Sequence, residues 1–148
     1  VVVAGHGAEA VGAATLAYDE DAIVVVQQDQ LGTGHAVKQA KDALAGFSGD
    51  VIVLYGDTPF IQSETLDAML TAGATADVVV LGFQAANPGR YGRLMMDGDA
   101  LERIVEFKDA TDEERMVNLC NSGVISAKSD VIFDLLDAVS DDNAAGEY

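Results

Sequence analysis

Short polar segments that directly follow apolar runs carry the side chains best suited to chemistry. The first, residues 27–36, reads QQDQLGTGHA and places two glycines around Thr33, so that backbone N–H groups and a hydroxyl lie where a helix is expected to begin. Such donors suit an acceptor-rich group, for example the edge of a uracil base or a phosphate. The segment contains no lysine and is therefore not a P-loop. A purely structural turn explains the same residues equally well, and for His35 we favour a packing role.

The second segment, residues 55–59, reads YGDTP and ends the most apolar of the expected strands. An aspartate at the carboxyl end of a central strand is well placed to bind Mg²⁺ beside a phosphate. The alternative is that Asp57 caps the helix that follows. We favour the metal-binding interpretation.

The third group of polar residues combines GRYGR at residues 89–93 with Glu106 and the NSG sequence at residues 121–123. Positive charge is concentrated in this part of the chain, because residues 1–89 contain only two lysines and no arginine. Five of the eight cationic side chains follow within one stretch, namely Arg90, Arg93, Arg103, Lys108 and Arg115. This grouping suits a bound anion, with scattered surface charge as the alternative.

Residues 5–10 read GHGAEA and match the G-x-G-x-x-A pattern of dinucleotide-binding turns. The next apolar run ends in Gln27, however, and not in the acidic residue that would hold a ribose. We therefore favour a tight turn that includes His6, and a dinucleotide-dependent oxidoreductase is the last of the enzyme interpretations.

Composition narrows the class of protein further. The 148 residues are 49% hydrophobic and carry a net charge of −17, which indicates one globular domain and argues against binding nucleic acid or an anionic membrane by bulk charge. The single cysteine excludes an internal disulfide and indicates a reducing compartment. No apolar run approaches the roughly 18 residues of a membrane span. The opening VVVAGHG has neither a methionine nor a basic leader region, so we expect a fragment.

The elements that must position these residues follow from apolar patterning. Continuous β-branched runs predict buried strands at residues 1–4, 22–27, 50–55 and 76–83. Apolar positions at helical spacing separate these runs, and further helical spacing follows Ser129 near the end of the chain, with Ser63 and Ser129 as expected N-caps. This alternation is typical of an α/β fold with a mainly parallel sheet.

An antiparallel insertion interrupts that alternation. Residues 93–96 and 101–107 flank Asp97-Gly98, which predicts a hairpin. Thr111 and Glu114 fit a capping box, and residues 121–127 predict one more strand.

Six motifs occur in order along the chain: QLGTGHA, YGDTP, GRYGR, IVEFKDAT, NSG and NAAGEY. Together they resemble the uridyltransferase domain (UDP-N-acetylglucosamine pyrophosphorylase) of the bacterial bifunctional GlmU family. Each motif alone is weak, but QLGTGHA, YGD and IVEFKDAT at these separations are specific, and the resemblance covers residues 1–148. It implies a Rossmann-like nucleotidyltransferase fold. The implied reaction joins UTP and N-acetylglucosamine 1-phosphate into UDP-N-acetylglucosamine, a cell-wall precursor, and releases pyrophosphate.

The resemblance also implies roles for individual residues. Those expected at the uracil or elsewhere on the nucleotide are Gln27, Gly32, Thr33, Tyr55 and Gly56. Asp57 is the expected catalytic residue, as a ligand of Mg²⁺. The N-acetylglucosamine group would be held by Gly92, Glu106 and Asn121, through a backbone N–H, a carboxylate and an amide. Such chemistry needs positioning and charge neutralisation and no covalent nucleophile, so Cys120 is expected to pack in the sheet.

The chain departs from the family pattern in what it lacks. The family begins with a strand and a Gly-rich phosphate loop of the type L-A-A-G-x-G-T-R-M, followed by a lysine, and no segment here matches them. A second metal ligand, an asparagine, and the family's acetyltransferase domain are also missing. We therefore expect residues 1–148 to be part of a nucleotidyltransferase domain. The resemblance implies a cytoplasmic enzyme without nucleic-acid or membrane partners, whose full-length form is a homotrimer through the absent domain.

Two alternatives stay open at this point. One is a nucleotidyltransferase that acts on another sugar or nucleotide, because related sheets serve other pairs. The other is a non-catalytic module that binds nucleotide sugars, which the missing phosphate loop makes credible.

We predict that the 148-residue chain by itself has little or no uridyltransferase activity, because the residues expected to cradle the triphosphate are not in it. The test is pyrophosphate release from UTP and N-acetylglucosamine 1-phosphate. Release at rates near those of a complete domain would contradict the prediction.

Overall fold

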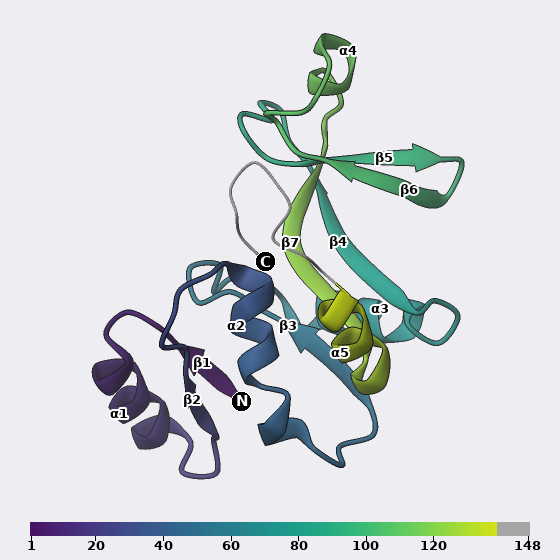
Figure 1. Ribbon diagram of the computed structural model, residues 1–148. Coiled ribbons are helices and arrows are strands. Elements are labelled where there is room, and N and C mark those ends of the chain that lie inside the picture. Colours follow the sequence, from purple (N-terminus) through teal and green to yellow (C-terminus); the bar gives the residue numbers. More distant parts are fainter. Residues whose placement is uncertain (139–148) are drawn as a thin grey trace. The chain divides into compact units, whose positions relative to one another are not determined.

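The computed structural model describes residues 1–138, and these fall into two compact units (Figure 1). Unit 1 contains Val1–Val51 together with the chain from Lys128 onward, and unit 2 contains Ile52–Ala127. The NAAGEY motif lies outside the described residues, as does Val139.

Unit 1 is built on a pair of short parallel strands, β1 (Val2–Ala4) and β2 (Val24–Val26), in which Val3 pairs with Val25. Helix α1 (Ala8–Tyr18) connects them and contacts both, because parallel neighbours need a long crossover between them. Helix α2 (Thr33–Gln39) contacts β1 and also α5 (Ser129–Ala138), and a short 3₁₀ turn, η1 (Asp42–Leu44), follows α2.

Helix α5 begins where the chain re-enters unit 1. The Ser129 N–H donates to the carbonyl of Gly49 at 2.9 Å, and the Ser129 hydroxyl donates to the carbonyl of Phe47 at 2.9 Å. Ser129 is thus the first residue of the helix, and the prediction that it is the N-cap was wrong. The same correction applies to Ser63, which is the first residue of α3 (Ser63–Ala72) behind Gln62 as N-cap. In both cases the apolar spacing located the helix correctly, but the helix begins one residue earlier than predicted.

Five strands form the sheet to which unit 2 contributes: β3 (Asp50–Val53), β4 (Val78–Gln84), β5 (Arg93–Asp97), β6 (Ala100–Val105) and β7 (Leu119–Lys128). Their order is β3-β7-β5-β6, and β4 also pairs with β7. Strands β4 and β7 are antiparallel, from Val78 opposite Ala127 to Gln84 opposite Leu119. Strands β5 and β6 form the predicted hairpin, and β5 joins β7 where Arg93 faces Cys120.

The α/β class and the inserted antiparallel hairpin are confirmed. Strands β1 and β2 pair parallel, whereas the pairs β4–β7, β5–β6 and β5–β7 are antiparallel. The reason is the connection: residues 85–118 contain the hairpin and a one-turn helix, α4 (Asp112–Arg115), and not the long helical crossover that parallel pairing needs.

The core of unit 2 lies along β7, where Cys120 and Val124 are fully buried. The register of β4 against β7 shifts between Val80 and Gly82, and the Ser122 hydroxyl donates to the carbonyl of Leu81 at 2.6 Å, which satisfies a backbone group at the irregularity.

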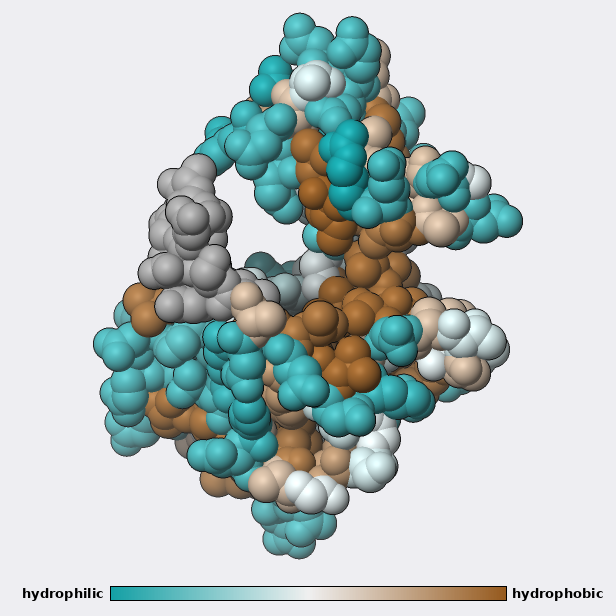
Figure 2. Space-filling view, turned by 45° about the vertical axis from the view of Figure 1, so that its right-hand side comes forward, coloured by the Kyte–Doolittle hydropathy of each residue, from teal (hydrophilic) through white to brown (hydrophobic). Residues whose placement is uncertain are grey.

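Much of the visible surface is hydrophilic, as 25 acidic residues in 148 would suggest, with apolar patches between (Figure 2). Among the described residues, no helix is both long enough and apolar enough to cross a bilayer.

The predicted capping box is confirmed. Thr111 Oγ1 accepts from the Glu114 N–H at 3.2 Å, while the Glu114 carboxylate accepts from the Thr111 N–H at 2.7 Å and from Arg103 Nη2 at 2.8 Å. These bonds, chiefly the one from the Thr111 backbone and then that from Arg103, lower the pKa of Glu114. A lowered pKa means that Glu114 stabilises the fold above the pKa it has in the unfolded chain. That contribution is lost as the pH falls through the lowered value.

We predict that Thr111→Ala lowers the free energy of unfolding by about 1 kcal/mol, the usual value of an N-cap. Glu114→Gln should flatten the pH dependence of stability just below the ordinary glutamate pKa, whereas Glu113→Gln on the same helix should not. Urea unfolding at a series of pH values measures both effects. Identical pH profiles for the two glutamine variants would refute the role of Glu114.

Candidate functional site

In unit 1, Gln27 is fixed at the carboxyl end of β2. Its N–H donates to the carbonyl of Ala4 at 2.9 Å, and its side chain is buried. Gln27 Nε2 donates to the carbonyl of Gly32 at 3.2 Å and lies 2.9 Å from His35 Nδ1. One amide therefore links the strand end, the loop and the first turn of α2. The packing role favoured for His35 agrees with these contacts.

Gly32 and Thr33 form the start of α2. Gly32 is the N-cap with φ of 108°, a conformation that favours glycine, and Thr33 is the first helical residue and is exposed. The first N–H groups of a helix have no partner inside that helix, so they are available to an acceptor. The three residues predicted at the uracil thus lie together.

Sequence reasoning missed a neighbour of this cluster. A Cβ added at Gly5 would lie 3.3 Å from Gln30 Nε2 and 3.5 Å from Gln27 Oε1. The first glycine of the G-x-G-x-x-A pattern therefore faces the side chains of the 27–36 segment. The sequence signal that could have identified Gln30 is its position in the 27–36 segment, directly before Leu31 and Gly32.

In unit 2, two of the residues predicted at the sugar, Glu106 and Asn121, each lie against the third, Gly92. The Asn121 N–H donates to the carbonyl of Gly92 at 2.8 Å. A Cβ added at Gly92 would lie 2.8 Å from Glu106 Oε1, so the carboxylate lies against a backbone that only glycine leaves open. Gly92 is buried, whereas Glu106 is exposed.

Tyr55 joins this cluster through Gly123. Asn121 Oδ1 accepts from the Gly123 N–H at 2.9 Å, and Gly123 has φ of +84°. A Cβ added at Gly123 would lie 2.9 Å from Tyr55 Cε2, so the phenol ring packs directly on this glycine. Gly123 belongs to the NSG motif, but the sequence pattern alone predicted no role for it.

Gly56 and Asp57 follow Tyr55 in an exposed turn. The carbonyl of Tyr55 accepts from the Thr58 N–H at 3.1 Å and from the Thr58 hydroxyl at 3.2 Å. No atom lies within 4 Å of a Cβ added at Gly56, and Asp57 is exposed. Residues 1–138 contain no group of three His, Cys, Asp or Glu side chains that could hold a metal. A lone exposed carboxylate fits Mg²⁺, which keeps most of its waters and combines one or two carboxylates with substrate phosphates.

Three of the five cationic side chains grouped between Arg90 and Arg115 already have partners within the protein. Arg93 is buried among carbonyls, Arg103 pairs with Glu114, and Arg115 pairs with Asp112 at 3.2 Å. The idea that the whole group offsets a bound anion is therefore not needed to explain these three side chains.

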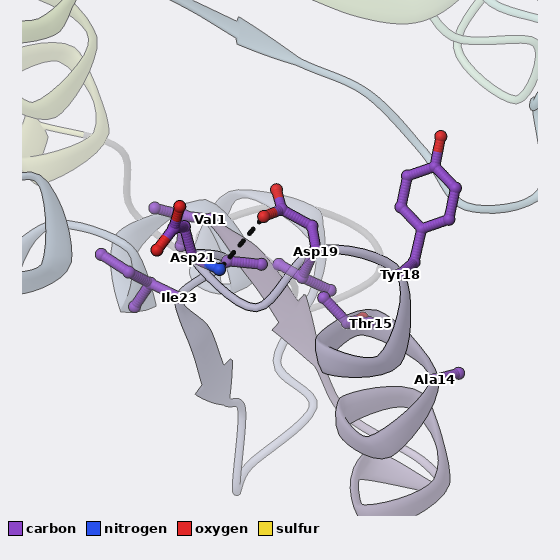
Figure 3. Close-up of a pocket in the computed structure, with 9 residues that line it drawn as sticks. Val1, Ala14, Thr15, Tyr18, Asp19, Asp21 and Ile23 are labelled. Carbon is purple, nitrogen blue, oxygen red and sulfur yellow. Dashed lines mark hydrogen bonds between the residues drawn. The ribbon is translucent and has the colours of Figure 1, made fainter.

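An open pocket of about 620 Å³ lies elsewhere in unit 1, between the end of α1 and the starts of β1 and β2 (Figure 3). Its polar lining includes Thr15, Asp19 and Asp21, and the Asp21 N–H donates to Asp19 Oδ1 at 3.1 Å. The Tyr18 side chain points away from the other labelled residues. None of the predicted site residues lines this pocket.

Comparison with known proteins identifies the sequence neighbours. The chain matches the nucleotidyl transferase family over residues 14–147. It is 62% identical over 148 residues to the bifunctional protein GlmU of Ruegeria pomeroyi and to that of Roseobacter denitrificans, and 55% identical to that of Paracoccus denitrificans. In each case the match covers 100% of this chain and 33% of the relative. The chain thus spans about a third of the length of the curated relatives it matches.

Solved structures agree on the fold at low identity. A UDP-glucose pyrophosphorylase in complex with UDP-glucose superposes with a TM-score of 0.68 at 18% identity, covering 93% of this chain and 61% of that one. HddC from Yersinia pseudotuberculosis superposes with a TM-score of 0.64 at 22% identity, covering 89% and 56%. These likenesses show the nucleotidyltransferase fold.

We predict that Gly123→Ala destabilises the chain more than Gly98→Ala does. Both glycines have positive φ, 84° and 59°, so each alanine costs about 1–2 kcal/mol of backbone strain. Only at Gly123 would the new methyl also overlap a ring, that of Tyr55, whereas nothing lies within 4 Å at Gly98. Overpacking adds about 1–3 kcal/mol. Urea unfolding measures the difference, and equal losses would show that Tyr55 does not pack on Gly123.

Proposed function

The chain belongs to the nucleotidyl transferase family. From this premise we propose that it is part of an enzyme that transfers the uridylyl group of UTP to N-acetylglucosamine 1-phosphate. The products are UDP-N-acetylglucosamine, used as a cell-wall precursor, and pyrophosphate. Identity of 62% to proteins named bifunctional GlmU supports this substrate pair.

This proposal rests chiefly on the contacts that Glu106 and Asn121 each make with Gly92 in unit 2. Among the described residues, the Glu106 carboxylate has no hydrogen-bond partner and is exposed, so it can accept bonds from sugar hydroxyls. Asn121 Oδ1 is already bonded to Gly123, which leaves its NH₂ group to donate to an acceptor such as an acetyl carbonyl. A free carboxylate and a donor amide, carried by two residues that both lie against Gly92, suit an N-acetyl sugar.

We propose nucleotide contacts within each unit taken by itself: Gln27, Gly32 and Thr33 in unit 1, and Tyr55 and Gly56 in unit 2. The first N–H groups of α2 can donate to the carbonyl oxygens of uracil. The Gln27 amide, held by Gly32, keeps its oxygen for a ring N–H.

The reaction needs positioning more than covalent chemistry. An oxygen of the sugar phosphate attacks the α-phosphorus of UTP in line, opposite the leaving pyrophosphate. One P–O bond forms as the bond to the bridging oxygen breaks, so no enzyme-bound intermediate is required. We propose that Asp57 holds Mg²⁺, which when bound offsets phosphate charge. The protein's own part is to hold the two substrates so that the attacking oxygen, the α-phosphorus and the leaving oxygen lie in line.

The alternatives make different predictions. A nucleotidyltransferase for another sugar would prefer glucose 1-phosphate to the N-acetyl sugar in a substrate panel. A non-catalytic module would bind UDP-N-acetylglucosamine without turnover. The cytoplasmic location and the trimer of the full-length protein stay predictions from the resemblance.

We predict that Glu106→Gln raises KM for N-acetylglucosamine 1-phosphate by about 10- to 100-fold, since a bond to a charged group is lost. Asp57→Asn should instead lower kcat, by on the order of 100-fold or more, at saturating substrates. The measurement is pyrophosphate release by a polypeptide of the length of the relatives.

Glu102→Gln and Asp97→Asn, exposed changes on the β5–β6 hairpin, are the matched controls and should leave both constants within about twofold. Full activity in Glu106→Gln or Asp57→Asn would overturn the corresponding assignment.

A further inference from the structure

Arg93 is the most buried charged side chain in the part of the chain that the structure describes. Its exposed fraction is 2%, and every hydrogen-bond acceptor of its guanidinium is a backbone carbonyl. Nη1 donates to the carbonyl of Tyr91, and Nη2 donates to those of Gly89 and Arg115 at 3.1 and 3.2 Å. No carboxylate among residues 1–138 pairs with it, and its Nε has no partner there.

Burying a charge without an ion partner costs folding free energy, and apolar side chains of similar volume often stabilise a fold as well or better. What an apolar side chain cannot do is hold three carbonyls in fixed directions, whereas the planar fork of arginine can. The guanidinium joins both ends of the 89–91 turn to the carbonyl at the end of α4. We conclude that geometry is the reason for an arginine at this position.

The second contact of the guanidinium is with Phe107. The Arg93 Cζ lies 5.9 Å from the ring centroid, and the Arg115 Cζ lies 4.9 Å from the same ring. Phe107 directly follows Glu106 in the chain. Arg93 therefore reaches, through one side chain, both the turn before Gly92 and the segment that carries Glu106.

The backbone of Arg93 completes the arrangement. In the sheet, Arg93 pairs with Val105 on β6 and with Cys120 on β7. Those two residues directly precede Glu106 and Asn121, and Arg93 itself directly follows Gly92. Each residue proposed to contact the sugar is thus adjacent in sequence to Arg93 or to a residue that pairs with it. A change in the conformation of the Arg93 side chain would therefore displace Gly92 and Glu106 first.

We propose that Arg93 is a positioning residue for the sugar half of the substrate: its buried guanidinium fixes the 89–92 turn and Phe107, and so sets the spacing of Gly92, Glu106 and Asn121. This rests on the proposed function. Arg93 touches no substrate in this account and acts through its neighbours. None of its contacts involves Gln27, Gly32 or Thr33, so its influence falls on the sugar and not on the uracil.

The test substitutes Arg93→Lys and Arg93→Gln in a polypeptide of the length of the relatives, with Arg103→Lys as the matched control. Arg103 lies on the same hairpin but pairs with Glu114 at the surface. We expect KM for N-acetylglucosamine 1-phosphate to rise about 10- to 100-fold in both Arg93 variants, because small displacements of binding groups cost that much. KM for UTP and kcat should change less than about threefold, and Arg103→Lys should match the wild type.

Phe107→Leu is the second variant, because it removes the ring but leaves the guanidinium and its three acceptors in place. It should raise the KM for the sugar phosphate by about 3- to 10-fold with the KM for UTP unchanged. If the Arg93 variants do not fold, as judged by circular dichroism, this variant decides the matter. An unchanged KM for the sugar phosphate in folded Phe107→Leu then refutes the proposal.

Three results would overturn the inference. One is a folded Arg93→Lys protein with wild-type KM values, and another is an equal rise in the KM values for both substrates, which indicates a general structural role. The third is a wild-type protein that is inactive on this substrate pair. That result refutes the proposed function as well, and the wild-type reaction by itself distinguishes it from the other two results.

Discussion

Strand β7 pairs with β4 along most of its ten residues and meets β5 where Cys120 faces Arg93. This pairing determines the candidate sugar site. It directs the Asn121 N–H to the carbonyl of Gly92 and places Gly123 under Tyr55. Because side chains alternate across a strand, a slip of one residue would turn Asn121 to the other face of the sheet. The buried Cys120 and Val124 oppose such a slip, since they would have to leave the core.

Glycine is as important to these sites as the polar side chains. At Gly92 a methyl group would meet the Glu106 carboxylate, at Gly123 it would meet the Tyr55 ring, and Gly32 has a φ that other residues rarely adopt. At Gly92 and Gly123 a polar or aromatic side chain thus lies where a Cβ would otherwise be. In the GRYGR and NSG motifs, close approach to a glycine backbone and a side chain of the candidate site therefore coincide, whereas in QLGTGHA the glycine provides the φ at the start of α2.

Much of the local structure was predictable from the sequence. The β-branched runs located β1 to β4, Asp97-Gly98 located the hairpin, and Thr111 with Glu114 gave the capping box, because each depends on residues close in the chain. The antiparallel pairing of β4 with β7 joins residues some 40 positions apart and was not predicted. The buried Arg93 was missed for the same reason, because its acceptors at Gly89 and Arg115 lie on both sides of the hairpin.

If Gly92, Glu106 and Asn121 hold an N-acetyl sugar, a crystal structure of the full-length protein with UDP-N-acetylglucosamine will show it. We expect the Glu106 carboxylate within hydrogen-bond distance, about 2.6–3.2 Å, of sugar hydroxyls, and the Asn121 amide on the N-acetyl group. A sugar bound away from these three residues, with Glu106 and Asn121 facing solvent, would rule out this assignment.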